Sequence, residues 1–399
     1  MKMNAWLYLA SAGASMLGNS VVQIVWPWLV LNRTGDPAAA GMVATVIAVP
    51  ALLFAIVGGH LVDNVGRKRM SVVSDVVSSA SVASVVVVDH VFGLNLWWFI
   101  ALGIVGAVGD IPGMAARNAL ITDIAKDSGV TVSRLSGFNQ SLVGITFLLG
   151  PALAGALMSV LSIELVLWIT AACSLLAAVL TALLRLSGEA PVAEEEVFKG
   201  WRAWGSLLQI APVRMLAVMT LVSGMLVGPL LTVLLPAQFE SLGRPVLLGL
   251  SMSSFAVGMI VISMAVSAVG LAYRRRAWVI AIALLAISFG CTAFLDTTWL
   301  VFLGMFVAGL GSGLTGPIVT LVVTEETPES MRGRAFSLFT AINLFATPIG
   351  LSLATLALKF YSIYWLAVAL LVVWLPVAVW AIARGARVLP HYRSASLVE

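Results

Sequence analysis

Two carboxylates lie inside long apolar stretches of this 399-residue chain, Asp75 and Asp110, and Arg117 follows directly after the second of these stretches. An ionisable side chain in lipid is costly and is a functional candidate by default. Asp110 and Arg117 are seven residues apart, which is two helical turns, so a helix presents them on one face. Burial favours the neutral form of a carboxyl group, whereas a nearby cation favours its charged form. We therefore predict a proton-coupling group with Asp110 as the leading carboxylate, Arg117 as its partner and Asp75 as the second candidate. Simple pairing of either aspartate with basic residues near the ends of the stretches stays open.

A second group of candidates could line a cavity for a substrate. Its members form one polar and aromatic stripe at helical spacing in the first apolar stretch, one polar pair near the end of the chain, and one adaptable methionine. They are Asn19, Gln23, Trp26, Met225, Asn343 and Thr347. Hydrogen bonding between helices would explain the polar members equally well. Because no lysine or arginine lies deep in a stretch, we expect an amphipathic substrate and not a phosphate or a polycarboxylate.

The elements that carry these residues follow from composition. Hydrophobic residues make up 61% of the chain and charged residues only 10%, and the mean hydropathy is +1.06. Soluble domains carry about 25% charged residues, and a helix needs about 20 apolar residues to cross a bilayer. We predict an all-α membrane protein with twelve transmembrane helices. The expected spans are 5–31, 38–61, 70–88, 96–116, 137–161, 164–186, 213–237, 246–272, 277–294, 298–323, 335–358 and 362–384.

The basic residues predict the orientation of these spans. Of the 22 Lys and Arg residues, all but Arg33, Arg244 and Lys359 fall on one side of the predicted membrane. By the positive-inside rule this side is cytoplasmic, so both termini are expected in the cytoplasm of a bacterial cell whose inner membrane holds the protein. The first span is expected to stay in the mature protein, because it continues past a short signal-like segment without a cleavage site. The net charge of +4 is explained by topology, and no nucleic-acid partner is expected.

Several chemistries find no support in the sequence. Two cysteines and three histidines are too scattered to suggest a disulfide framework or a metal site. No phosphate-binding glycine loop appears, so direct use of ATP is not expected. An interfacial cluster of histidine and carboxylates, which a membrane-embedded transferase would need, is also missing. We expect neither an enzyme nor a cofactor, with the proton gradient as the energy source.

An internal repeat predicts the domain organisation. Gly35-Asp36-Pro37 and Gly243-Arg244-Pro245 each open a span, and the basic triplets at 67–69 and 274–276 each follow that span. Six spans per copy make the repeat parallel, with an axis along the membrane normal. We predict two pseudo-symmetric six-helix bundles at 1–186 and 213–399, joined by a cytoplasmic linker at 187–212. Such a duplication suits alternating access to a site near the membrane midplane.

The segment GGHLVDNVGRKRM between the second and third spans resembles the signature of the major facilitator superfamily. A glycine can allow close helix packing, another can permit a tight turn, and an aspartate can accept from a helix N-terminus. The matching residues are Gly59, Asp63, Gly66, Arg67, Lys68 and Arg69. The resemblance implies the major facilitator fold, and it implies that Asp63 latches the two halves together at the inner face while the transporter faces outward. A topogenic basic loop is the simpler interpretation of the same residues.

A second resemblance covers Met114 to Leu157 and narrows the family to its efflux branch, which includes macrolide exporters and enterobactin-type siderophore exporters. It rests on Ala116-Arg117-Asn118-Ala119-Leu120 and on a glycine and proline motif in the fifth span. That motif approximates the one associated with antiporters, with Ala154 where a glycine is often found. Its residues here are Gly144, Gly150, Pro151 and Gly155. Pro151 could bend the span, and the glycines could let it slide against a partner helix.

These features together predict a secondary transporter that acts as a monomer and exchanges protons for small amphipathic molecules such as drugs, secondary metabolites or siderophores. A lipid or lysolipid flippase of the same fold is the alternative, with membrane lipid as its substrate. Nutrient import and a membrane-embedded transferase are weaker alternatives.

Overall fold

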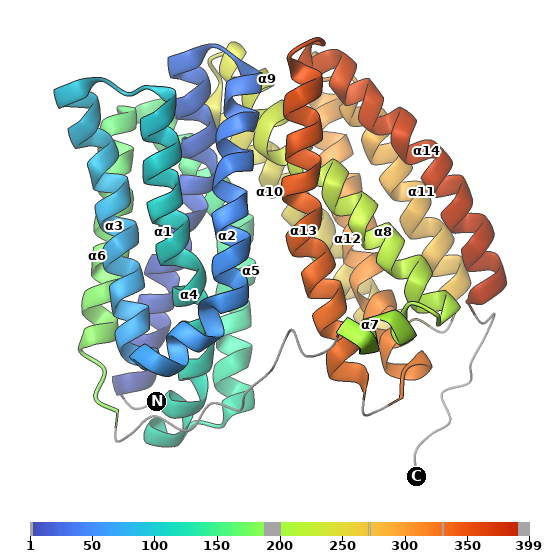
Figure 1. The fold of residues 1–399 in the computed structure, drawn as a ribbon, viewed down its shortest axis with the longest axis horizontal. Helices are drawn as coiled ribbons and strands as arrows, with labels where there is room; N and C mark the ends of the chain where they lie inside the picture. Colours follow the sequence, from blue (N-terminus) through green and yellow to red (C-terminus); the bar gives the residue numbers. More distant parts are fainter. Residues whose placement is uncertain (1–2, 187–200, 270, 272, 329–330, 390–399) are drawn as a thin grey trace. The chain divides into compact units, whose positions relative to one another are not determined.

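The computed structural model describes residues 3–186, 201–269, 271, 273–328 and 331–389, without the side chains of 56–61, 63, 201–203 and 269. Within these ranges all regular secondary structure is helical. In this part of the chain, twelve helical segments are long and apolar enough to cross a membrane. The predicted all-α, twelve-span architecture is therefore confirmed (Figure 1).

Contacts divide the chain into two compact units, Met1–Glu195 with Phe239–Gly249, and Glu196–Gln238 with Leu250–Glu399. The predicted linker falls partly outside the described residues, at 187–200. The first unit is built on α1 (Met3–Thr34), α2 (Pro37–Val65), α3 (Arg67–Phe92), α4 (Leu96–Ser128), α5 (Val132–Val160) and α6 (Ile163–Ala182).

The rest of the described chain forms a short α7 and then the segments of the second repeat. These are α7 (Trp201–Leu207), α8 (Ala211–Pro229), η1 (Leu230–Leu234), α9 (Leu235–Ser241), α10 (Pro245–Val269), α11 (Arg274–Thr292), α12 (Thr298–Glu326), α13 (Arg332–Leu358) and α14 (Ile363–Val388).

Short polar and glycine residues set the helix ends in the first unit. Asp36, Asn95 and Ser162 cap α2, α4 and α6 by accepting hydrogen bonds from backbone N–H groups of the first turn, which have no partner within the helix. Gly66 and Gly93 end α2 and α3 with φ of +90° and +73°, a region that favours glycine. The turns at Gly66 and Gly93 let the chain reverse direction between consecutive long helices.

The seventh span is not the single regular helix that was expected. It consists of α8, the π-helix η1 and α9, and the irregular turn begins directly after Pro229. Proline has no N–H to donate, and the backbone N–H of Leu235 reaches back to the carbonyl oxygen of Leu230, the wider spacing of a π-helix. The proline therefore accounts for the bulge.

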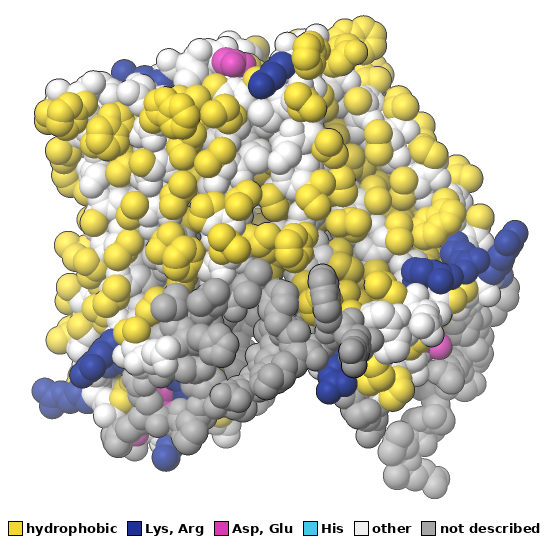
Figure 2. Space-filling view, viewed as in Figure 1, with side chains coloured by type: hydrophobic (Ala, Val, Ile, Leu, Met, Phe, Trp, Pro, Cys, Tyr) yellow, Lys and Arg dark blue, Asp and Glu magenta, His cyan; other side chains and the backbone are white. Residues whose placement is uncertain are grey.

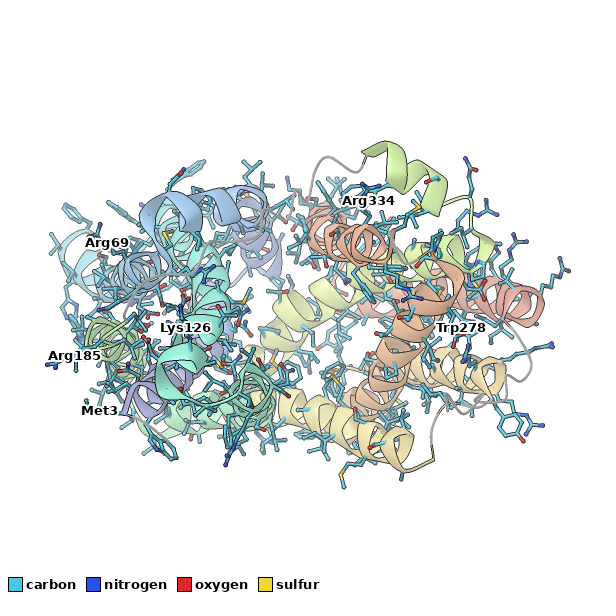
Figure 3. All side chains as sticks on the ribbon, turned by 90° about the horizontal axis from the view of Figure 1, so that it is seen from below. Met3, Arg69, Lys126, Arg185, Trp278 and Arg334 are labelled. Atoms are coloured by element: carbon cyan, nitrogen blue, oxygen red, sulfur yellow. The ribbon has the colours of Figure 1, made fainter. Side chains whose placement is uncertain are left out.

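The described surface has the composition of a membrane protein. Large apolar side chains are exposed along the long helices, and Figure 2 shows these side chains covering the sides of the helices. In the first unit, Met3, Arg69, Lys126 and Arg185 lie together at one end, seen from below in Figure 3. Apolar helix sides with charged residues at the helix ends are the surface pattern of a multi-pass membrane protein.

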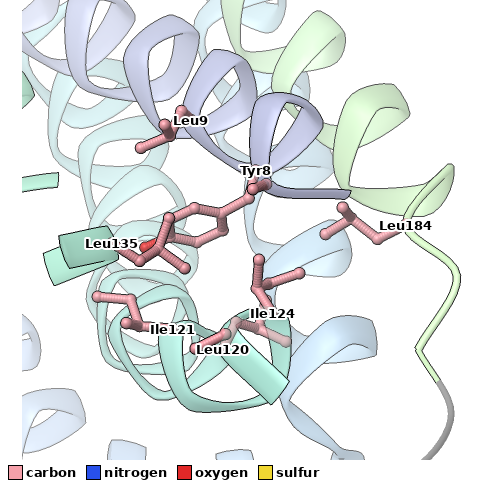
Figure 4. Packing of buried hydrophobic residues seen from close by; sticks show 9 residues of the cluster. Tyr8, Leu9, Leu120, Ile121, Ile124, Leu135 and Leu184 are labelled. Atoms are coloured by element: carbon pink, nitrogen blue, oxygen red, sulfur yellow. The ribbon is translucent and has the colours of Figure 1, made fainter. Parts of the chain in front are cut away.

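At the same end, a buried hydrophobic cluster joins α1, α4, α5 and the segment that follows α6. Tyr8 lies at its centre, surrounded by leucine and isoleucine side chains (Figure 4). The cluster comprises Ala5, Tyr8, Leu9, Leu120, Ile121, Ile124, Ala125, Leu135 and Leu184. Because α4 continues to Ser128, three turns beyond the expected end of its span, it carries both Arg117 and four members of this cluster.

Candidate functional site

Small residues allow α3 and α4 to approach closely. A Cβ atom at Gly113 would overlap the side chain of Ser74, and one at Gly109 would lie 3.2 Å from the backbone oxygen of Ser74. The Ser74 hydroxyl donates a hydrogen bond to the carbonyl oxygen of Gly109. Only glycine permits such a backbone approach between membrane helices, and it brings the ionisable residues of α3 and α4 into direct contact.

The centre of the site is a buried ion pair between α3 and α4. Nη2 of Arg117 lies 2.5 Å from Oδ2 of Asp75, and the two side chains are 9% and 5% exposed. Ser15 on α1 donates to the other carboxylate oxygen of Asp75 at 3.0 Å. Nε of Arg117 is also buried and has no hydrogen-bond partner among the described residues. Asp75 is thus held from two helices, while Nε of Arg117 is a buried donor that these contacts do not use.

Tyr8 anchors the same arginine through its backbone. Its hydroxyl lies 3.2 Å from the carbonyl oxygen of Arg117 and 3.3 Å from Oδ1 of Asn139 on α5, so it can donate to either. The ring of Tyr8 is packed in the hydrophobic cluster described above. The ion pair thus contacts α1 directly through Ser15, and Tyr8 relates the backbone of Arg117 to Asn139 on α5.

Asp110 lies beside this pair and lines a small cavity. Its Oδ1 accepts a hydrogen bond from Ser78 on α3. The cavity has a volume of about 180 Å³ and is also lined by Asn19 and Trp26 of α1. Trp26 packs edge-on against Phe99, and its buried indole N–H has no partner in the described part of the chain. This cavity therefore combines a carboxylate with polar groups.

The structure gathers the three predicted coupling residues in one bundle but pairs them differently from the expectation. Arg117 contacts Asp75 on the neighbouring helix, and not Asp110 on its own helix. Two helical turns separate Asp110 from Arg117 by about 10 Å along the axis, whereas the close packing of α3 on α4 removes the separation from Asp75. Packing between α3 and α4 therefore determines which carboxylate Arg117 contacts.

The basic motif after α2 contains a second buried ion pair. Nη1 of Arg67 lies 2.9 Å from Oδ2 of Asp123 on α4, with side chains 6% and 1% exposed. Lys68 donates from Nζ to the carbonyl oxygen of Leu184 at 2.6 Å, whereas Arg69 is exposed. The basic triplet thus includes one buried pair as well as exposed charge.

Other parts of this motif are only partly described. Gly66 forms the tight turn that was expected, with its N–H donating to the carbonyl oxygen of Val62 at 2.9 Å. The side chain of Asp63 and the packing around Gly59 lie outside what the structure describes, so the predicted latch stays a prediction.

The sequence patterns used above did not identify Asp123. It lies seven residues after Ala116 and three after Leu120, which places it on a face of α4 that these two residues bury. An acidic residue in that register, close to a basic triplet at the start of the preceding helix, was a usable signal for a buried pair.

The predicted hinge in α5 contains residues in different environments. Pro151 and Gly155 are buried within α5, and Gly150 packs against Ser20, so a larger side chain at Gly150 would overlap it. Gly144 has open space around it. Close packing is therefore shown for Gly150, and sliding of the helix stays a prediction.

The other predicted cavity residues are separated. Gln23 is exposed and does not line the cavity at Asp110. Met225 is half-buried in α8, and Thr347 packs against Gly228. Asn343 lines a cavity of the second unit with a volume of about 360 Å³, where its amide donates to the carbonyl oxygen of Phe339 at 3.1 Å. Asn19 and Trp26 are the two candidates that share a cavity with Asp110.

Comparison with known families agrees with this architecture. The model of the Major Facilitator Superfamily matches residues 8–243 and 216–396, which together cover most of the chain. The chain belongs to the Major Facilitator Superfamily. It is accordingly a membrane transporter and not an enzyme, as the sequence motifs predicted.

Relatives within this superfamily are efflux pumps by name. The multidrug efflux pump Tap of Mycolicibacterium fortuitum is 29% identical over 360 residues, covering 87% of each chain. Macrolide efflux protein A of Streptococcus pyogenes is 22% identical over 366 residues, covering 89% of each chain. The predicted resemblance to macrolide exporters is thereby confirmed.

Solved structures share the fold at low sequence identity. The nucleoside transporter NupG superposes with a TM-score of 0.71 at 15% identity, covering 96% of this chain and 99% of that one. A D-xylose–proton symporter gives 0.70 at 14% identity, with 98% and 99% covered. These similarities extend to the major facilitator fold alone.

Proposed function

We propose that this transporter exports small amphipathic molecules in exchange for protons, and that Asp75, Asp110 and Arg117 couple the two movements. The observation that carries the proposal is the buried pair of Asp75 and Arg117 beside a cavity lined by Asp110. A buried ion pair contributes little net stability, so stability alone is a weak reason for its presence in an apolar bundle. Titratable residues within a membrane typically mark ion and proton pathways. Efflux as the direction is supported by the names of the relatives.

The geometry suggests how a proton would act. A proton on Asp75 removes the negative charge that faces Nη2 of Arg117, and the guanidinium then needs another acceptor. Asp110 is the next carboxylate along the same helix face, and rotation of the Arg117 side chain would bring the two together. Loss of the proton restores the first pair. The serine hydroxyls on Asp75 and Asp110 can serve either state, because a hydroxyl both donates and accepts.

This exchange would reach several helices at once. Ser15 on α1 bonds to Asp75 on α3, and Asp75 pairs with Arg117 on α4. Tyr8 contacts the backbone of Arg117 and the side chain of Asn139 on α5. A ligand or proton shifts an equilibrium by its different affinity for the two states. In this proposal the inward-facing and outward-facing states differ in which carboxylate Arg117 contacts.

The same proposal includes the setting of the protein. It places the chain as a monomer in a bacterial cytoplasmic membrane with both termini in the cytoplasm. The position of Met3 at the same end of the first unit as Arg69, Lys126 and Arg185 supports a cytoplasmic N-terminus. The proton gradient drives export without a cofactor, and its electrical part supplies about 2.3 kcal/mol per charge per 100 mV. Drugs, secondary metabolites and siderophores are the proposed substrate classes.

The test is transport in proteoliposomes with an imposed pH gradient and an internal pH dye. Amphipathic cations, macrolides, siderophores and fluorescent lipids are added in turn. Proton movement evoked by one class of small molecule supports antiport and identifies that class as substrate. Movement of lipid without proton flux would contradict antiport and favour a flippase of the same fold.

A further inference from the structure

Three helices of the second unit gather positive charge at one end. In this unit α14 packs against both α8 and α11, and the three helices together carry six arginines and no acidic residue. Every one of the six lies in the first turn of α8 or α11 or in the last turns of α14, and Figure 2 shows basic side chains gathered near the lower end of α14. The arginines are Arg214, Arg274, Arg275, Arg276, Arg384 and Arg387.

Direct contacts hold these helix ends together. Nε1 of Trp278 on α11 donates to the carbonyl oxygen of Ala381 on α14 at 3.0 Å, and a Cβ atom at Gly385 would overlap the ring of Trp278. Leu216 of α8 lines the same cavity as Trp278. Since α11 begins one turn before Trp278, its basic first turn lies beside the last turns of α14.

The protein neutralises only part of this charge. Nη2 of Arg274 donates to Oε1 of Glu325 on α12 at 2.6 Å. The guanidinium of Arg276 lies over the ring of Tyr273, 5.0 Å from its centroid, which leaves its charge in place. Four of the six arginines are in no ion pair with a described residue, namely Arg214, Arg276, Arg384 and Arg387.

The outer face of α14 joins this charge to an apolar surface. Val373, Trp380, Arg384 and Arg387 follow one another at intervals of seven, four and three residues, so they lie on one helix face. Val373 and Trp380 are 49% and 41% exposed, and Arg387 is also exposed. The stripe therefore changes from apolar to basic toward the helix end, as a phospholipid changes from acyl chain to headgroup.

We infer that this end of the second unit binds an anionic phospholipid. Arg384 and Arg387 hold its phosphate, for which the planar guanidinium is suited, and an acyl chain lies along Trp380 and Val373. The unpaired arginines of α8 and α11 add to the attraction. Each arginine near an anionic headgroup is worth about fivefold in affinity. The lipid is a resident partner and not a transported molecule, so the inference does not rest on the proposed function.

The experiment is native mass spectrometry of the full chain in detergent, titrated with dioleoyl phosphatidylglycerol or with dioleoyl phosphatidylcholine. The two lipids share their acyl chains and their phosphate and differ in net charge. We expect the wild type to bind its first phosphatidylglycerol at least about tenfold more tightly than phosphatidylcholine, since a zwitterionic headgroup gains little from the excess of arginines. Equal affinity for the two lipids would overturn the inference.

Two double variants test the arginines of α14. Arg384→Gln with Arg387→Gln should weaken phosphatidylglycerol binding by about 10- to 25-fold, at about fivefold per arginine, and leave phosphatidylcholine binding unchanged. Arg384→Lys with Arg387→Lys keeps both charges and should retain most of the affinity. This second variant separates loss of charge from a general disturbance of the helix end.

The matched control removes the same number of charges elsewhere. Lys126 and Arg185 are exposed at one end of the first unit (Figure 3), and their joint replacement by Gln should change the affinity by less than about twofold. Wild-type affinity in Arg384→Gln with Arg387→Gln would overturn the inference. An equal loss in this variant and in the control would also overturn it, because the attraction would then come from the net charge of the protein and not from a site.

Discussion

The two bundles of the repeat use their interiors differently. In the first unit, a cavity of about 180 Å³ holds the carboxylate of Asp110 next to the buried pair of Asp75 and Arg117. In the second unit, a cavity of about 360 Å³ is walled by aromatic and aliphatic side chains, with no charged residue among its described lining. A duplicated fold can thus place titratable groups in one copy and an uncharged, mostly apolar cavity in the other. In our proposal the titratable groups of the first unit couple proton movement to transport.

The largest effect is expected from breaking the buried pair on one side. Asp75→Asn leaves the Arg117 guanidinium buried without a counter-charge, which should lower the free energy of unfolding by about 3–5 kcal/mol. Gradient-driven transport should be lost. Thermal unfolding in detergent and transport in proteoliposomes measure the two effects.

A double variant separates structure from coupling. Asp75→Asn combined with Arg117→Gln removes both charges, so most of the lost stability should return while coupled transport stays absent. Recovery of transport in the double variant would show that the pair has only a structural role.

The next effect comes from placing a carboxylate in the second unit. Ile282→Asp puts a charge-bearing group at a fully buried position, at a cost of about 2.5–3.5 kcal/mol for an acidic residue at the centre of a membrane helix. Ile282→Val, which costs about 0.5–1.5 kcal/mol, is the matched control. Equal stability of the two variants would contradict the contrast between an apolar and a polar interior.

A smaller effect on stability, but a clear one on transport, is expected at Asp110. Asp110→Asn keeps an oxygen to accept from Ser78, so the free energy of unfolding should change by less than about 1.5 kcal/mol. Transport should slow and lose part of its pH dependence, because Arg117 would have no second carboxylate. A pH profile of transport identical to that of the wild type would remove Asp110 from the mechanism.

The smallest effect is expected from Tyr8→Phe, which deletes the hydroxyl that reaches the backbone of Arg117 and the side chain of Asn139. One hydrogen bond is worth about 0.5–1.5 kcal/mol, so thermal unfolding should detect a modest loss. Tyr361→Phe, at a 63% exposed position, is the control and should leave stability unchanged. A loss as large as that of Asp75→Asn would mean that Tyr8 supports the whole bundle.

The fold was readable from the sequence because its main determinants are local. Runs of apolar residues set twelve spans, and Gly66 marks the turn after the second. Two departures from the predicted spans have causes in the local sequence that the prediction did not use. Pro229 precedes the π-helix in the seventh span, and α4 runs to Ser128 because charged residues at its end are compatible with a helix outside the hydrocarbon.

The site was only half readable, because pairing between helices is not local. Asp75, Asp110 and Arg117 were found as ionisable residues in or next to apolar stretches, but helical periodicity relates Arg117 only to Asp110 and does not indicate its direct contact with Asp75. The signal that decides the partner is the close approach of Gly109 and Gly113 to α3. Small residues four apart on one helix predict close packing, but not against which helix.

The most direct test of the central claim is proton flux in proteoliposomes that contain the double variant Asp75→Asn with Arg117→Gln, beside the wild type. A substrate identified with the wild type is added on one side, and an internal pH dye follows protons while substrate movement is recorded separately. We expect substrate to evoke proton flux in the wild type, and in the double variant to move only down its own gradient without proton flux. Substrate-evoked proton flux of wild-type size in the double variant would contradict coupling through Asp75 and Arg117.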